Sequence, residues 1–112
     1  MLDLAEDVRR ESFPGHLVPH LMHPLVRDAD PRVRRRAAEV APRLGRAATC
    51  AVLVELLADP DAWVAEAAAY AIGEHPAPTR AAIASVTRAA TGHSDPLVRE
   101  AAVAALGAQG DP

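Results

Sequence analysis

The stretch DPLVREAAVAALG, residues 95–107, decides the fold, because related forms of it occur twice more in the chain. Asp30-Pro31-Arg32-Val33-Arg34 precedes two alanines at 37–38, and Asp61-Ala62-Trp63-Val64 precedes three alanines at 67–69. The valines of these copies stand at positions 33, 64 and 98, so the copies recur at a nearly constant interval. Units of this length that cannot bury an apolar face alone stack into a solenoid. The period therefore predicts an all-α solenoid of three helix pairs.

Composition supports helices rather than sheet. Half of the 112 residues are apolar, but Phe13, Trp63 and Tyr70 are the only aromatic ones, and alanine is plentiful. Alanine favours helices and lets their backbones approach closely, whereas strands favour β-branched and aromatic residues. A chain of this length has room for one domain, and three repeats are about the minimum that buries a continuous core.

Each repeat is predicted to hold two helices. In the first repeat, leucines at 17, 21 and 25 recur every four residues, and a short Asp-Pro turn precedes a second apolar stripe. We expect an N-terminal amphipathic capping segment at 1–15, followed by repeats at about 16–45, 46–75 and 78–108. Gly73 and Gly107 are predicted to end the second helices of repeats two and three. The tail from Ala108 onward is expected to fray.

The phrase at 95–107 resembles the HEAT-repeat family, in particular the bacterial HEAT-like repeats also found in bilin-lyase proteins. The resemblance covers about residues 16–108 and implies a right-handed α-solenoid. It also implies a ladder in which an aspartate ending each first helix meets an arginine six residues later. The ladder positions here are Asp28 with Arg34, Asp59 with Ala65, and His93 with Arg99. The pattern is broken twice, by Ala65 in place of an arginine and by His93 in place of an aspartate. Asp59 can then pair with Arg34 or Arg99 of a neighbouring repeat.

The outward positions of the second helices form the predicted binding face, which is the concave face of such a solenoid. Offsets 0, +4, +7 and +8 from each valine are apolar and face inward, so offsets −1, +2 and +6 are exposed. Trp63, Glu66 and Tyr70 then lie on one stripe of the central repeat, and Trp and Tyr often dominate binding energy. The flanking repeats add Arg32, Arg35, Glu39, Leu97 and Glu100. An alternative also stays open, in which Trp63 covers the turn between helices and Tyr70 packs against the next repeat.

This face predicts a protein-binding adaptor, scaffold or assembly factor that holds a peptide, helix or small domain. The first alternative is a small enzyme or enzyme subunit that acts on a small molecule around Trp63, Glu66 and Tyr70. An enzyme would show an enclosed cavity with a buried glutamate, whereas an adaptor would show an open groove. The sequence has no Gly-rich phosphate loop and no Ser-His-Asp ordering. No catalytic residue, cofactor or metal ligand is predicted.

The second alternative is nucleic-acid binding through the arginines at 32, 34, 35 and 36. Seven arginines and three acids between 27 and 46 give a local charge of +4, although the whole chain carries −3. A dedicated nucleic-acid-binding domain is usually basic overall. Arg34 belongs to the ladder, and Arg32 and Arg36 have Asp28, Asp30 or Glu39 within reach. All twelve basic residues are arginine and asparagine is absent, which is typical of a GC-rich genome. Nucleic acid is therefore not the predicted partner.

His16, His20 and His23 have a spacing that would place three imidazoles on one helical face for a metal. Pro19 favours a helix start, which leaves His16 outside the regular turn. No metal site is therefore predicted from these residues.

Compartment and association follow from smaller signals. Cys50 is the only cysteine and lies in an apolar stretch, which fits a reducing compartment. The acidic start does not have the pattern of a signal peptide, and no stretch approaches the ~20 apolar residues that span a bilayer. We expect a cytoplasmic protein with no membrane partner. The last helix has apolar residues on its outer side, which predicts a homo-oligomer through the C-terminal repeat.

Overall fold

The computed structural model describes residues 18–44 and 47–110, and within them it has six helices and no strand. They are α2 (Val18–Val26), α3 (Pro31–Leu44), α4 (Ala47–Leu57), α5 (Ala62–Glu74), α6 (Arg80–Gly92) and α7 (Pro96–Gln109). The predicted all-α fold is confirmed, and the helices follow one another as three pairs. The capping segment predicted at 1–15 lies outside the described residues.

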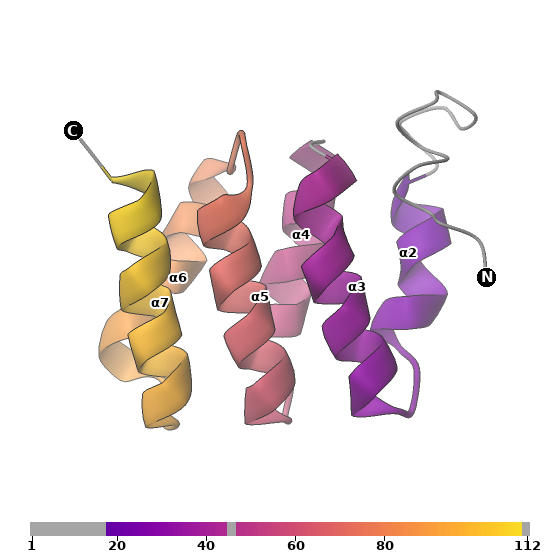
Figure 1. The fold of residues 1–112 in the computed structure, drawn as a ribbon, viewed down its shortest axis with the longest axis horizontal. Coiled ribbons are helices and arrows are strands. Elements are labelled where there is room, and N and C mark those ends of the chain that lie inside the picture. The colour runs from indigo at the N-terminus through magenta and orange to yellow at the C-terminus, as the bar shows by residue number, and fades with distance from the viewer. Residues whose placement is uncertain (1–17, 45–46, 111–112) are drawn as a thin grey trace.

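The pairs stack side by side in two layers. Figure 1 shows the second helices α3, α5 and α7 next to one another in one layer, with α4 and α6 behind them. Successive second helices pack more closely against each other than successive first helices do. The molecule is a short α-solenoid, and no helix of its described part is long and apolar enough to cross a membrane.

An aspartate precedes each second helix and caps it, as predicted. The Asp95 carboxylate accepts a hydrogen bond of 2.8 Å from the backbone N–H of Leu97, and Pro96 occupies the first helical position. Asp61 caps α5 in the same way through the N–H of Trp63, and Asp30 accepts from the N–H of Arg32. An aspartate in this position satisfies an N–H group that has no partner within the helix.

The core consists of small side chains around a few larger ones. Val64, Val98 and Ile72 are fully buried, and so are many of the alanines that follow the valines. Cys50 is buried among them as a thiol. The largest fully buried apolar side chains elsewhere in the described residues are Met22, Leu53, Leu56 and Val86. Because alanine fills little space, the helices must lie close together to exclude voids.

Gly73 and Gly107 do not end helices, so that prediction is wrong. Helix α5 continues past Gly73 to Glu74, and α7 continues past Gly107 to Gln109. Gly73 is buried where α5 meets α7, and a Cβ atom built on it would lie 2.8 Å from the Cα atom of Ala105. The glycine is required by this close approach of two backbones and not by a left-handed turn.

Gln109 joins the ends of α5 and α7. Its side-chain amide nitrogen lies 3.1, 2.8 and 2.9 Å from the carbonyl oxygens of Ile72, Gly73 and His75. These carbonyls belong to the C-terminal end of α5, where helical acceptors lack partners within the helix. The expectation that the tail frays from Ala108 is therefore wrong for Gln109, which is helical and bonded to the neighbouring repeat.

We expect Gln109→Ala to lower the free energy of unfolding by about 1–2 kcal/mol, because a typical hydrogen bond contributes about 0.5–1.5 kcal/mol and the amide has two hydrogens to donate. Urea unfolding followed by circular dichroism measures this change. Gln109→Glu is the matched variant, since it keeps the shape but places a negative charge beside α5 carbonyls. It should be less stable than Gln109→Ala, and equal stability of wild type and both variants would contradict the capping role.

A buried histidine links α4 to the end of α5. The Nε2 atom of His75 lies 2.9 Å from the hydroxyl of Thr49, and its Nδ1 atom accepts a hydrogen bond from the N–H of Ala77. Because Nδ1 is an acceptor, the neutral ring carries its proton on Nε2 and donates it to Thr49. Both side chains are buried, so this bond holds two elements of the central repeat together.

Candidate functional site

The predicted binding residues lie on the outer side of the second helices, a surface called here the second-helix face. It comprises the outward side chains of α3, α5 and α7, namely Arg32, Arg35, Glu39, Trp63, Glu66, Tyr70, Leu97 and Glu100. All eight are exposed or half-buried. The nearly constant repeat interval puts equivalent positions of adjacent helices next to each other.

Arg35 is the centre of this face. Its guanidinium lies over the Trp63 ring, 4.5 Å from the centroid, and donates a hydrogen bond to the Trp63 carbonyl. The same group lies 3.4 Å from a Glu66 carboxylate oxygen and 3.5 Å from one of Glu39. One side chain of α3 thereby holds the aromatic ring and the acid of α5. Glu39, Arg35 and Glu66 form a charged line that crosses from one repeat to the next.

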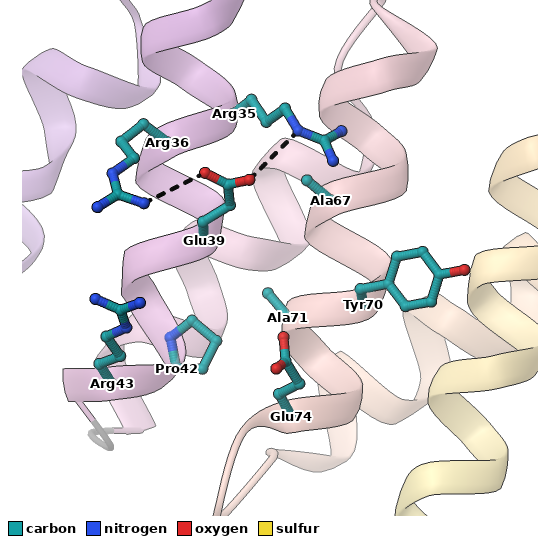
Figure 2. A pocket seen from close by; sticks show the side chains of 9 residues that line it. All are labelled: Arg35, Arg36, Glu39, Pro42, Arg43, Ala67, Tyr70, Ala71 and Glu74. Atoms are coloured by element: carbon teal, nitrogen blue, oxygen red, sulfur yellow. Dashed lines mark ion pairs between the residues drawn. The ribbon is translucent and has the colours of Figure 1, made fainter.

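Three large apolar side chains of the face remain open to solvent. Trp63 is 46% exposed, Tyr70 is 47% exposed and Leu97 is 54% exposed. Figure 2 shows the Tyr70 ring standing out from α5 toward α7. The contact with Arg35 covers part of the Trp63 ring, and the rest of the ring is open to solvent.

A groove runs between α3 and α5 beside these residues. It encloses about 370 Å³ and is open to solvent. Figure 2 shows its lining, in which small alanines of α5 face the longer charged side chains of α3. The lining residues are Arg35, Arg36, Glu39, Pro42, Arg43, Ala67, Tyr70, Ala71 and Glu74. Tyr70 lines the groove and also belongs to the exposed apolar side chains of the second-helix face.

The glutamates in and beside the groove are not buried. Its carboxylates, Glu39 and Glu74, are exposed, and Glu66 beside it is half-buried and paired with Arg35. Within residues 18–44 and 47–110 no glutamate is buried. A general acid or base needs an environment that shifts its pKa, and burial is the usual cause.

The arginine cluster is paired with carboxylates. Arg32 contacts Asp30 at 2.8 Å, and this hydrogen bond lowers the pKa of the Asp30 carboxyl and raises that of the guanidinium. Arg36 lies 3.6 Å from Glu39, and Arg35 is shared as described. Each of these guanidinium groups already has an acid beside it, so the cluster offers little unopposed charge to phosphates.

The ladder is formed by Arg34 and Asp59. Nε and Nη2 of Arg34 donate to the two carboxylate oxygens of Asp59 at 2.8 and 3.2 Å, and this pairing raises the pKa of the arginine. Of the two sequence alternatives for Asp59, the structure therefore has Arg34. The expected pairing of Arg34 with the Asp28 side chain is not formed: Arg34 donates to the Asp28 carbonyl, while the Asp28 carboxylate accepts from the N–H of Asp30.

At the last repeat the ladder has no acid. Nη1 of Arg99 donates to the carbonyls of His93 and Ser94 at 2.6 and 3.2 Å. Within the described residues, no carboxylate lies within ion-pair distance of Arg99. His93 occupies the aspartate position and accepts a hydrogen bond from the N–H of Asp95, so it keeps the local turn but not the negative charge.

The three-histidine spacing falls mostly outside what the structure describes. Neither His16 nor the side chain of His20 is described, and His23 is exposed. Among the side chains of residues 18–44 and 47–110 that are placed, no group of three or more His, Cys, Asp or Glu could hold a metal ion.

Sequence reasoning missed the central role of Arg35. The signal was present, because Arg35 and Glu66 occupy the same offset, +2 from the valine, in adjacent repeats. Opposite charges at one offset of neighbouring helices predict a contact across the junction. The stacking of Arg35 on Trp63 follows from the same adjacency.

Comparison with known proteins gives the family. A model of HEAT repeats matches residues 18–82, which is more than half of the chain and includes the first two helix pairs. The match gives no support to the bilin-lyase type in particular. No curated protein matches the chain. Repeats of this kind generally mediate protein–protein interaction. By its fold, its repeat period and this match, the chain belongs to the HEAT-repeat family.

Proposed function

We propose that the protein is a binding adaptor or scaffold that holds a protein partner on its second-helix face. The observation that carries this proposal is the exposure of Trp63, Tyr70 and Leu97 together beside an open groove. Large apolar side chains that stay exposed on one face, rimmed by charges, are typical of interaction sites. The HEAT-repeat match supports the same class of function.

The charged and apolar side chains along the face indicate which side chains a bound segment would carry. The α3 side carries the exposed Arg43, which has no carboxylate within ion-pair distance among the described residues, whereas the α7 side carries the exposed Leu97. A segment that fits this face has apolar side chains over α5 and α7 and an acidic side chain at the Arg43 end of α3. The groove beside Tyr70 suits one anchoring side chain of such a segment.

The rigidity of the face is part of the proposal. Arg35 fixes the Trp63 ring before any partner arrives, through the stacking contact and the hydrogen bond to the Trp63 carbonyl. Side chains that are ordered in advance lose less conformational entropy on binding. We therefore infer that Trp63 is the first anchor of the face and that Arg35 holds it in position.

The test begins with capture of the partner. A photo-crosslinking residue at Glu100, on the second-helix face, should give a specific adduct in cells, whereas the same residue at Thr87 of α6 should not. Trp63→Ala should then weaken the captured partner by about 2 kcal/mol or more, as measured by calorimetry, because a central Trp is a typical hot spot. The variant's melting temperature should fall by only a few degrees, since an exposed cation–π contact contributes about 0.5–1 kcal/mol.

Arg88→Ala on α6 is the matched control and should bind with unchanged affinity. Full affinity of Trp63→Ala for a partner crosslinked at Glu100 would remove Trp63 from the site. Unfolding of Trp63→Ala at room temperature would show instead that its ring is structural.

A further inference from the structure

The outer side of α7 has a stripe that no described residue covers. Arg99, Val103 and Gly107 follow one another at intervals of four residues and so lie on one side of the helix. Val103 is 59% exposed, and a Cβ atom built on Gly107 would meet nothing within 4 Å. The opposite side of α7 is buried and includes Ala105, which packs against Gly73 of α5.

The same stripe on α5 is a helix-docking surface. Its residues, at the equivalent offsets from Val64, are Ala65, Ala69 and Gly73, and all three are buried. There the structure shows the occupant, because α7 lies on this side of α5 with Ala105 against Gly73. At Gly107, α7 repeats the small residue of Gly73 and leaves open space for the backbone of one more helix, while Arg99 and Val103 replace the alanines at 65 and 69.

Arg99 supplies an independent argument about charge. Arg34 and Arg99 are held alike, because Nη1 of each donates to the carbonyls six and five residues earlier. The remaining nitrogens of Arg34 reach the acid of the following repeat, Asp59. Where the arginine is replaced by Ala65, the following acid is replaced too, by His93. Between the described repeats, arginine and acid are thus present together or absent together. Among the described residues, Arg99 has no acid and Asp28 has no arginine in the ladder.

The other helix of the last repeat does not continue the pattern. Leu53 and Leu57 of α4 are buried, but the equivalent positions of α6 are Thr87 and Thr91, which are exposed. Both threonine hydroxyls donate to carbonyls of their own helix. On α6, threonines therefore replace the leucines that would pack against another repeat. On α7, the small residue and the ladder arginine of a repeat junction are both present.

We propose that the outer stripe of α7 is a second interaction surface, whose occupant is a single α-helix of a partner protein. The helix lies along α7 as α7 lies along α5. It presents alanine or another small residue to Gly107, and a carboxylate in the turn before its first residue binds Arg99. Asp59 stands in that position, three residues before the start of α5 at Ala62.

A second copy of this chain fits the stripe poorly. The face that α3 would present carries Arg36, whereas the equivalent positions of α5 and α7 are the buried alanines Ala67 and Ala101. The Arg36 guanidinium is exposed and would have to be displaced from Glu39 or buried at the junction. The start of α3 does carry an acid, Asp28, in the position that Asp59 has before α5, so the burial of Arg36 and not the charge of Arg99 opposes a second copy.

The test uses the chain's own α5 as the probe helix. Residues 59–75 are appended to the full chain through a glycine-serine linker of about 16 residues, whose span of about 20–24 Å matches the length of a 14-residue helix. Tethering gives an effective concentration in the millimolar range, which compensates for weak binding. We expect the thermal midpoint of the solenoid to rise by about 4–8 °C relative to the unfused chain.

Variants at the two contacts locate the helix. Gly107→Leu should abolish the rise, measured against the unfused Gly107→Leu chain, which should be at least as stable as the unfused wild type because the site has open space. Asp59→Asn in the appended copy and Arg99→Gln should each remove part of the rise, and together no more than either alone, since they break one pair. Thr87→Glu on α6 is the control and should leave the rise intact.

Two results would overturn the proposal. One is a fused chain whose midpoint does not rise, or rises equally with Gly107→Leu, which would place the helix elsewhere or nowhere. The other is an unfused chain that sediments as a dimer and becomes a monomer with Gly107→Leu, because a second copy would then be the occupant.

Discussion

Replacing Val64 with aspartate is expected to cost about 3–5 kcal/mol of folding free energy, the penalty for an unpaired buried charge. Val64 is fully buried in α5, the helix that packs against both α3 and α7. Native domains are stable by about 5–15 kcal/mol in total, so the variant should be largely unfolded at room temperature or melt far below the wild type. Circular dichroism during heating measures both outcomes.

Val103→Asp is the matched control, because it makes the same chemical change on an exposed valine of α7. Substitutions at exposed positions usually change stability by less than about 0.5 kcal/mol, so this variant should melt near the wild type. If Val64→Asp melted at the wild-type midpoint, the assignment of Val64 to the junction of three repeats would be wrong.

The period of the sequence predicted the fold because each repeat uses the same local signals for its second helix. Each second helix begins at an aspartate that caps it, and in α5 and α7 the valine three residues later is fully buried. Val33 of α3, predicted to face inward in the same way, is only half-buried. Capping and apolar spacing are properties of neighbouring residues, so they can be read without knowing the fold. The exposed columns of the second helices followed from the same spacing, and Trp63, Tyr70 and Leu97 are indeed exposed.

The features that could not be predicted depend on distances between helices. Gly73 looks like a helix end in sequence, yet it serves a backbone approach to Ala105, which belongs to the second helix of the next repeat. Gln109 looks like part of a frayed tail, yet it meets three carbonyls of another helix. The residues next to Gly73 and Gln109 in sequence do not show which helix will lie against them. A local pattern therefore cannot distinguish a glycine or glutamine at a helix contact from one at a helix end.

The candidate site was predictable to a similar extent. The spacing gave the residues of the second-helix face but not their pairing, so Arg35 was placed on the face without being recognised as its centre. For the ladder, the family resemblance named Arg34, Asp59 and Arg99, and the break in the pattern left either arginine as the partner of Asp59. The structure has Arg34. The ladder runs from the arginine of one repeat to the acid of the next. Arg99, in the last described repeat, is therefore left without an acid among the described residues.

Two glycines at the same offset of α5 and α7 should respond to substitution with opposite signs. Gly73→Leu is expected to destabilise the protein by about 3 kcal/mol, at the upper end of what overpacking costs, because its Cβ would meet the backbone of Ala105. A backbone atom cannot rotate away as a side chain can, so relief requires α5 and α7 to separate. Separation would also pull the Gln109 amide from the carbonyls at the end of α5.

Gly107→Leu should instead be neutral or stabilising by up to about 0.8 kcal/mol, because leucine is a far better helix former than glycine and a Cβ at this site meets nothing within 4 Å. Urea unfolding of the two variants beside the wild type measures both changes with one method. Because the substitution and the helical offset are the same, the difference in free energy of unfolding reports only whether a helix lies against the glycine. Equal effects at the two sites would mean that α5 and α7 are not in close contact in solution. A strongly destabilised Gly107→Leu alone would mean that the outer side of α7 is already covered.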